Sequence, residues 1–427
     1  MKTFTNPDRK DWQKILKRPL FSVSELYPTV QSVLNEIKTH GDEALRKFTQ
    51  KFDGVKLDTF TVSTAEINEA DAQVDSALKE AIFLASENIK KFHKQQIPEL
   101  KKQETTPGVT CWQKAIPIEK IGLYIPGGTA PLFSTVLMLA LPAQIAGCKE
   151  IVLCSPPNKE GKIHPAILYA AKISGVTKIF KLGGVQAIGA MALGSETIPK
   201  TYKIFGPGNQ YVMAAKQLVA MSDVSIDMPA GPSEVLVVAD ESANPAFVAS
   251  DLLSQAEHGT DSQVVLVANS EQLVNQVKSE IQIQIEKLPR KAIATAALNN
   301  SVAIILNNKL EQIDLINEYA PEHLIICTSE SNETAGKITN AGSVFLGNLT
   351  PESAGDYASG TNHTLPTNGW ARSYSGVNID SFFKKITFQE ISEEGLKNIG
   401  PAIENMAAAE QLEAHKNAVT LRLKNIK

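Results

Sequence analysis

Residues 121–128 read Ile-Gly-Leu-Tyr-Ile-Pro-Gly-Gly, a short apolar run that ends in a glycine-rich turn. Similar short runs recur at 151–154, 178–182 and 203–205, and amphipathic segments lie between them. Short apolar strands that alternate with helices are typical of a mostly parallel sheet covered by helices on both faces. We therefore predict an α/β domain in this part of the chain.

A second series of the same kind lies further along the chain. Its predicted elements are strands at 234–238, 264–267 and 302–306, with helices at 244–257 and 271–288. Residues 1 to about 105 carry apolar side chains at helical spacing. The C-terminal stretch is also predicted to be helical, with Pro401 at a helix start. The sequence thus predicts two α/β domains with helical elements at both ends.

The composition excludes several classes of protein. The 427 residues are 43% hydrophobic and 21% charged with a net charge of −4, which is ordinary for a soluble globular protein. The chain has no polybasic block, so we expect neither nucleic acid nor a membrane as a partner. Residues 121–148 carry no charge, but prolines and glycines interrupt them, which favours a buried helix over a membrane span. The four cysteines form no CxxC pair and no signal peptide is visible, so we expect a cytoplasmic protein.

Three glycine-rich turns follow predicted strands: Tyr124-Ile-Pro-Gly-Gly, Leu182-Gly-Gly-Val-Gln186 and Phe205-Gly-Pro-Gly-Asn209. The chain has neither a GxGxxG motif after a predicted strand nor a GxxxxGK[ST] motif, so the usual nucleotide fingerprints are missing. Each turn alone is compatible with a plain strand-to-helix connection. Three such turns at the carboxyl ends of one parallel sheet favour ligand binding at that edge.

A candidate metal site comes from polar residues in three separate segments. Gln255 and His258 lie about 60° apart around the axis of the predicted helix 244–257, so both can face one ion. Asp356 and His415 complete a candidate set of two imidazoles, one carboxylate and one amide oxygen, which suits zinc. The alternative is a solvated polar helix end, and the sequence alone does not show that the four residues converge.

Glu322 and His323 follow a predicted helix that Pro321 ends. In a turn, a carboxylate and an imidazole can line one pocket and supply two proton-transfer groups of different basicity. The alternative is a surface turn with a capping glutamate. His363 lies in a polar, glycine-rich loop at 347–376, whose length is often functional, and is a further candidate ligand-binding group.

Six separated segments have highly specific sequences: GLYIPGGTAPLFSTVLMLALPAQIAGC, AGPSEVLVVAD, DLLSQAEHG, YAPEHL, PESAGDYASGTNHTLPTNGWAR and AAAEQLEAHK. In these segments the chain resembles the histidinol dehydrogenase family, and the resemblance covers essentially its whole length. It implies oxidation of L-histidinol to L-histidine with two NAD⁺, the last step of histidine biosynthesis.

The resemblance also implies roles for individual residues. One Zn²⁺ per subunit would be bound by Gln255, His258, Asp356 and His415. The same four residues would line the substrate pocket together with Ser233, His323, His363 and Glu410. NAD⁺ would be contacted by Tyr124, Gln186 and Asn209.

The chemistry of the reaction gives His323 and Glu322 definite tasks. Hydride transfer from an alcohol needs a base for the hydroxyl proton, and His323 is suited to this near neutral pH. The aldehyde must then be hydrated before a second hydride can leave, and Glu322 is expected to activate that water. The L-histidinal intermediate is expected to stay bound between the two oxidations, while Zn²⁺ orients the substrate.

The expected fold consists of two incomplete Rossmann-like parallel-sheet domains with small helical terminal elements, in an intertwined dimer. We expect a helical segment at 1–20, a first α/β domain with the catalytic and metal residues at 21–118 and 234–380, a second, NAD-side domain at 119–233, and a C-terminal helical tail at 381–427.

The tail is expected to reach the partner subunit of a homodimer with shared active sites. Glu410 and His415 are five residues apart, which leaves them about 140° apart around a continuous helix. Either the helix breaks between them or the substrate wraps around it.

Other functions remain open at this point. A cysteine nucleophile is disfavoured because Cys148, Cys154 and Cys327 lie in apolar surroundings and Cys111 has no neighbouring base in sequence. A zinc hydrolase would use a similar metal set, although it would not need the glycine-rich turns. A non-catalytic nucleotide-binding protein would make the metal set coincidental. Relatives that oxidise other amino alcohols are a nearer alternative.

Overall fold

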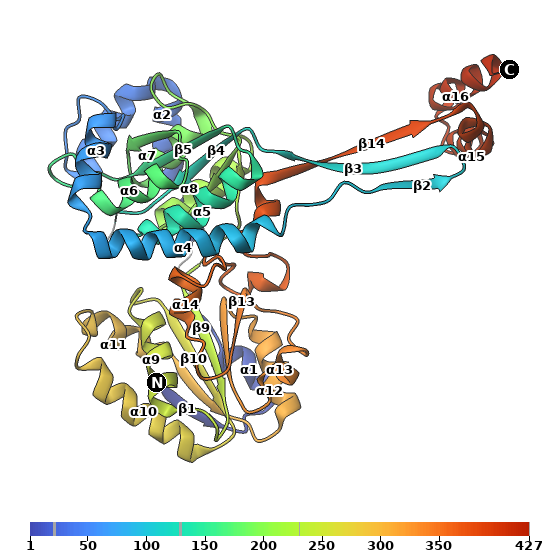
Figure 1. Cartoon of the computed structure of the whole chain (residues 1–427). Coiled ribbons are helices and arrows are strands. Elements are labelled where there is room, and N and C mark those ends of the chain that lie inside the picture. The colour runs from blue at the N-terminus through green and yellow to red at the C-terminus, as the bar shows by residue number, and fades with distance from the viewer. Residues whose placement is uncertain (20–22, 128–129, 230, 427) are drawn as a thin grey trace.

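The computed structural model of the chain consists of two α/β domains and a long arm that extends from one of them (Figure 1). The structure describes residues 1–19, 23–127, 130–229 and 231–426. We call the domain with the six-stranded sheet the first domain and the domain with the five-stranded sheet the second domain. Gly128 of the first predicted glycine turn and residue 20 of the expected N-terminal segment lie outside the described residues.

The first domain is built on a parallel sheet with the strand order β1-β11-β10-β9-β12-β13. Its strands are β1 (Lys2–Thr5), β9 (Glu234–Ala239), β10 (Gln263–Ala268), β11 (Val302–Ile305), β12 (His323–Cys327) and β13 (Ser343–Leu346). The four central strands are buried along their whole length, because helices cover both faces of the sheet. This double burial explains why the sequence shows them as continuous apolar runs.

Two groups of helices cover this sheet. One face packs against α9 (Pro245–Ala256), α10 (Glu271–Ile285) and α11 (Lys291–Asn299). The other face packs against α1 (Arg9–Ile15) and α12 (Lys309–Tyr319). The remaining helices of the domain are the short α13 (Ser331–Ala335) and α14 (Glu352–Tyr357).

The second domain has a parallel sheet with the strand order β6-β5-β4-β7-β8. Its strands are β4 (Lys120–Tyr124), β5 (Glu150–Ser155), β6 (Lys178–Lys181), β7 (Lys203–Phe205) and β8 (Ser225–Ile226). Between them lie α5 (Phe133–Ala146), α6 (Pro165–Ile173), α7 (Gly184–Leu193) and α8 (Gln210–Ala220). Helix α5 is buried nearly all round, which accounts for the uncharged stretch in the sequence. The strands predicted from apolar runs are therefore all present, and the α/β fold class is confirmed.

The N-terminal helices pack on the second domain. The sequence-based division had instead placed residues 21–118 in the first domain. These helices are α2 (Tyr27–Phe48), α3 (Thr64–Gln73) and α4 (Ser76–Lys94). Side chains of α2, such as Leu34 and Ile37, share a core with α7, and Ile82 and Ile89 of α4 share a core with α5. Helical periodicity shows which face of a helix is apolar, but not which sheet that face will cover.

The arm is an antiparallel sheet that ends in two helices (Figure 1). It consists of β2 (Lys102–Thr106), β3 (Val109–Pro117), β14 (Phe383–Ile391), α15 (Glu393–Ala409) and α16 (Glu413–Asn425). The expected helical tail at 381–427 therefore contains a nine-residue strand, β14, before its two helices. Pro401 lies inside α15, whose start is capped by Ser392, so its prediction as a helix start was wrong. A proline removes one backbone donor, and here the helix continues around it.

The loop after α14 connects the two domains. The side-chain amide of Asn362 donates to the Met138 carbonyl of α5 at 2.6 Å, and Asn88 of α4 donates to the Ala358 carbonyl at 2.8 Å. Figure 1 shows α14 on the side of the first domain that faces the second. Within the described residues, none of the helices is both long enough and apolar enough to cross a bilayer.

The core of the first domain gives a direct stability prediction. Leu266 lies in β10 at the centre of the sheet and is fully buried. We expect Leu266→Ala to lower the free energy of unfolding by about 2–5 kcal/mol, because a cavity replaces packed atoms. Leu310→Ala, at a side chain that is 63% exposed, is the control and should change it by less than about 0.5 kcal/mol. Urea denaturation of both variants measures the difference, and equal shifts would contradict the assigned core.

Candidate active site and metal centre

A buried polar cluster lies at the amino ends of β9 and β12, on the side of the first domain that carries α14. His323 begins β12, and its register partner Val235 follows Glu234 at the start of β9. Helix α9 runs back against the strands, so its last turn brings Gln255 to the same edge. The amino ends of strands present free backbone N–H groups, which suit carboxylates in this cluster.

His323 is the central group of the cluster. Its Nδ1 donates to the Glu234 carbonyl at 3.3 Å and lies 3.6 Å from the Glu322 carboxylate and 3.9 Å from the Glu352 carboxylate. Its Nε2 lies 3.7 Å from Asp356 Oδ1 and has no hydrogen-bond partner among the described residues. A buried ring nitrogen without a partner is available to a bound ligand.

The surrounding carboxylates control the protonation of His323. Burial alone would lower its pKa, but the negative charges of Glu352, Glu322 and Asp356 raise the pKa of His323 to about 10. These groups therefore stabilise the imidazolium that forms when His323 accepts a proton. Glu352 and Asp356 also lie at the candidate metal site, so a cation bound there would lower the pKa of His323.

Glu322 is also buried. Its Oε2 accepts a hydrogen bond from the backbone N–H of Glu234 at 2.9 Å. Burial raises the pKa of Glu322 to about 7, although His323 and this backbone N–H oppose the rise. A carboxylate with a pKa near neutrality suits general-base chemistry at physiological pH.

A group of potential metal ligands lies next to this pair. Ligand atoms of His258, Glu352 and Asp356 all lie within 4.8 Å of one another. Gln255 is 1% exposed, and its side-chain amide lies between the Glu352 carboxylate and the Glu234 backbone N–H. Imidazole, carboxylate and amide oxygen are ligand types that zinc accepts, so these residues fit a zinc ion.

Glu352 was not among the residues singled out from the sequence. It lies four residues before Asp356 on α14, so the two carboxylates project from the same face of that helical turn. Burial raises the pKa of Glu352 well above its usual range, whereas His323, despite the effect of burial, holds the pKa of Asp356 below its usual range. The Glu-x-x-x-Asp spacing is the signal that could have revealed it.

His363 and Ser233, both expected in the substrate pocket, lie at the edges of the cluster. The Nδ1 of His363 donates to the Asp356 carbonyl at 2.9 Å, and its Nε2 accepts from the Thr135 hydroxyl of α5 at 3.0 Å. His363 thus links α14 to the second domain through both ring nitrogens. Ser233 directly precedes Glu234 and is partly exposed.

The two remaining residues of the predicted metal and substrate site are not brought to the cluster within one chain. Glu410 caps the end of α15, and His415 lies on α16, so both are at the tip of the arm and exposed (Figure 1). Gln411 adopts a positive φ of 59° between the two helices. The helix therefore breaks between Glu410 and His415, as one of the two sequence-based alternatives required.

The predicted NAD contacts lie at the carboxyl end of the second sheet. The Tyr124 hydroxyl accepts from the Gly184 backbone N–H at 3.1 Å, and the Gln186 amide donates to Asp53 at 3.0 Å. The Asn209 side chain caps α8 by accepting from two backbone N–H groups at 3.1 Å. Gly206 has a φ of 123°, and a Cβ there would collide with the Tyr124 carbonyl. Together with the Gly184 contact, two of the glycine turns therefore pack against Tyr124.

The buried cysteines lie in surroundings that do not activate a thiol as a nucleophile. Burial raises the pKa of both Cys148 and Cys327 to about 12, and it also raises the pKa of Cys154. Cys111 is on β3 of the arm. Thiols with raised pKa values are poor nucleophiles, so the structure disfavours a thiohemiacetal mechanism.

Comparisons with known proteins give one consistent result. The histidinol dehydrogenase family model matches residues 16–423. A histidinol dehydrogenase of Bacteroides fragilis is 62% identical over 427 residues, with full coverage of both chains, and the chloroplastic histidinol dehydrogenase of Arabidopsis thaliana is 52% identical over 96% of this chain and 88% of its own length. The crystal structure of a histidinol dehydrogenase from Elizabethkingia anophelis matches with a TM-score of 0.98 and 56% identity, covering 99% of this chain and 98% of that one.

The candidate metal centre predicts a selective loss of zinc. We expect Asp356→Asn to weaken zinc binding at least about tenfold, because an amide cannot supply the anionic oxygen that faces His258 and Glu352. Glu333→Gln, at an exposed carboxylate paired with Lys337, is the matched control. Zinc retained after dialysis, measured by mass spectrometry, should fall only for Asp356→Asn. Equal retention by both variants would refute this centre.

Proposed function

The chain belongs to the histidinol dehydrogenase family, and we propose that it oxidises L-histidinol to L-histidine through bound L-histidinal, reducing two NAD⁺. Members of this oxidoreductase family catalyse the final step of histidine biosynthesis. The observation that carries the residue-level proposal is the buried pair Glu322 and His323 beside His258 and Asp356. Family membership also argues against the two alternative functions, a zinc hydrolase and a non-catalytic nucleotide-binding protein.

The substrate is held at the metal centre in this proposal. Gln255, His258 and Asp356 would bind Zn²⁺, and Glu352 lies close enough to add its carboxylate. When bound, Zn²⁺ supplies a fixed positive centre that orients nitrogen atoms of the substrate. Substrate nitrogens fixed in this way leave the alcohol end free to approach His323.

The first oxidation needs one proton and one hydride to leave the alcohol. Glu352 and Asp356 would share their charge with Zn²⁺ bound beside them, which would lower the pKa of His323. His323 Nε2, which has no hydrogen-bond partner among the described residues, then accepts the hydroxyl proton while the hydride goes to NAD⁺. The three carboxylates that raise the pKa of His323 stabilise the resulting imidazolium. The product is an aldehyde that remains held by its imidazole end.

The second oxidation starts from a hydrated aldehyde. Glu322, whose pKa is about 7, takes a proton from water as that water adds to the aldehyde carbon. As the water adds, His323 returns its proton to the carbonyl oxygen and becomes neutral again. It then takes a hydroxyl proton from the hydrate while a second NAD⁺ accepts the hydride. Tyr124, Gln186 and Asn209 are proposed NAD⁺ contacts, supported by their position at the carboxyl end of the second sheet.

We further propose a homodimer in which the arm completes the site of a second chain. The proposal is supported by the position of Glu410 and His415 at the exposed tip of the arm, far from the cluster of their own chain (Figure 1). His415 from the second chain would then join the metal ligands, and Glu410 would join the substrate pocket.

All four cysteines are free, which supports a reducing compartment such as the cytoplasm.

The reaction has a stoichiometry that tests it. With a limiting amount of L-histidinol, we expect two NADH per substrate, because both oxidations use the same bound molecule. Chelation should abolish NADH formation, and added Zn²⁺ should restore it. Absorbance at the NADH band measures the yield. One NADH per histidinol, or a yield that chelation leaves unchanged, would contradict the proposal.

The shared site predicts complementation between two inactive chains. His323→Ala and His415→Ala should each be inactive alone, because one lacks the base and the other a metal ligand. Mixed dimers should regain activity, since one of their two sites receives intact residues from both chains. The readout is NADH formation after co-refolding, with a His40→Ala mixture as the control. No recovery in verified mixed dimers would refute the shared site.

A further inference from the structure

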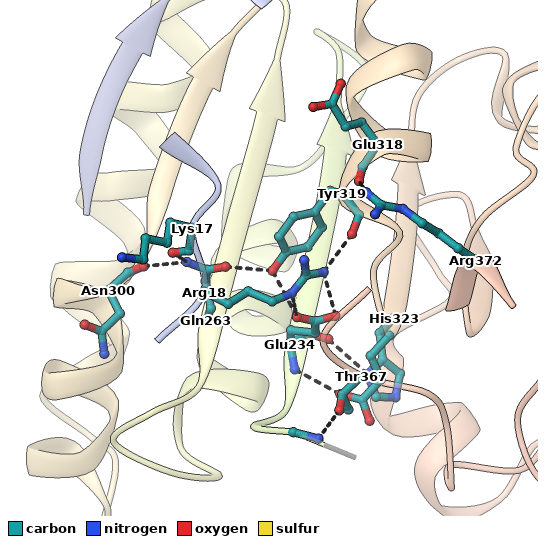
Figure 2. Close-up of polar contacts among 12 residues, drawn as sticks. Lys17, Arg18, Glu234, Gln263, Asn300, Glu318, Tyr319, His323, Thr367 and Arg372 are labelled. Atoms are coloured by element: carbon teal, nitrogen blue, oxygen red, sulfur yellow. Dashed lines mark hydrogen bonds and ion pairs between the residues drawn. The ribbon is translucent and has the colours of Figure 1, made fainter. Parts of the chain in front are cut away.

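Arg18 is a largely buried cation in the segment that follows α1, and it lies next to the catalytic edge of the first domain (Figure 2). Its Nε donates to Oε2 of Glu234, and its Nη2 donates to Oε1 of the same carboxylate at 2.9 Å. The Nη2 also donates to the Tyr319 carbonyl at 2.7 Å. The side chains of Arg18 and Glu234 are only 15% and 2% exposed. One guanidinium thus joins the start of β9 to the end of α12.

Both of these segments lead directly to the catalytic pair. The backbone N–H of Glu234 donates to Glu322 at 2.9 Å, and its carbonyl accepts from His323 Nδ1 at 3.3 Å. Tyr319 is the last residue of α12, and Ala320 turns the chain with a φ of 52° toward Glu322. A shift of either segment would therefore move the groups that exchange protons with the substrate.

The segment that carries Arg18 is itself fixed by further contacts (Figure 2). The guanidinium lies 3.9 Å from the ring centre of Tyr319, whose hydroxyl donates to Gln263 at 2.9 Å. The Gln263 amide donates to the Lys17 carbonyl at 3.1 Å and to the Asn300 carbonyl at 3.0 Å. These contacts fix the backbone at Lys17 and the plane of the guanidinium.

We propose that Arg18 is a positioning residue, which orients Glu322 and His323 through the Glu234 backbone and the turn after Tyr319. The proposal rests on the proton-transfer roles given to this pair under the proposed function. Arg18 touches no reacting atom. A planar guanidinium can donate to a carboxylate from two nitrogens, and one of these nitrogens can also donate to a carbonyl. A lysine ammonium cannot match this geometry.

A positioning role predicts a specific kinetic pattern. Because small displacements of catalytic groups are costly, we expect Arg18→Lys to lower kcat for L-histidinol by about 10- to 100-fold. The KM for L-histidinol and the zinc content should stay within about threefold of wild type, because three of the four proposed zinc ligands, His258, Asp356 and His415, contact neither Arg18 nor Glu234. Of the four, only Gln255 contacts the Glu234 backbone N–H. Arg9→Met is the matched control, since Arg9 also joins the N-terminal segment to α12 through an exposed pair with Asp314. It should leave kcat unchanged.

Further variants separate positioning from loss of stability. Glu234→Gln keeps the backbone groups that contact Glu322 and His323, but it removes the charge that pairs with Arg18. Its kcat should therefore fall with KM unchanged. The double variant Arg18→Lys with Glu234→Gln should lose little more than either single variant, because both act through one contact. If Arg18→Lys does not fold, the kcat of Glu234→Gln decides the question alone.

The outcomes distinguish this proposal from the proposed function. No NADH from L-histidinol with zinc-loaded wild type would refute the function itself. An active wild type, with kcat unchanged in folded Arg18→Lys or Glu234→Gln, would refute the positioning role alone. A fall in activity that only follows the folded fraction measured by circular dichroism would also refute it, because a structural role would then suffice.

Discussion

The negative charge buried around His323 is the constraint on which the rest of the site depends. Glu322, Glu352 and Asp356 converge on one imidazole, so the described cluster holds more carboxylates than cations. Buried charge is costly unless it is paired, protonated or bound to a metal. The structure meets this cost with the raised pKa values of His323, Glu322 and Glu352, and the donor set beside them suits a divalent cation. The proposed proton transfer and the proposed metal binding would therefore both depend on this one arrangement.

The two domains and the arm divide the remaining tasks. The first domain holds the charged cluster at the amino ends of its strands, whereas the second presents its glycine turns at the carboxyl ends of its own sheet. The loop after α14 joins them, because His363 contacts both Asp356 and Thr135. The arm carries Glu410 and His415 away from this chain, which is consistent with a site completed by a second copy.

Local sequence patterns predicted the buried core but not the contacts between distant segments. Strands such as β9 and β10 were predictable because burial on both faces leaves continuous apolar runs. Strand β14 was missed because it stands in the exposed arm with polar residues on both faces. The residue pattern grouped Gln255, His258 and Asp356 as candidate ligands, the family resemblance implied the same residues, and they do lie together. Arg18 was missed because its partner Glu234 is remote in sequence. The sequence also did not show which domain α2 belongs to, because the sheet that a helix covers depends on contacts between distant segments.

The most direct test of the account is anomalous diffraction at the zinc edge from crystals grown with Zn²⁺ and L-histidinol. We expect one zinc peak per chain at about 2.0–2.2 Å from a His258 nitrogen and oxygens of Asp356 and Gln255. His415 of a second chain should be a further ligand, and the alcohol carbon of histidinol should lie beside His323. A zinc peak elsewhere, or a metal site without His258 and Asp356, would rule out the proposed metal centre.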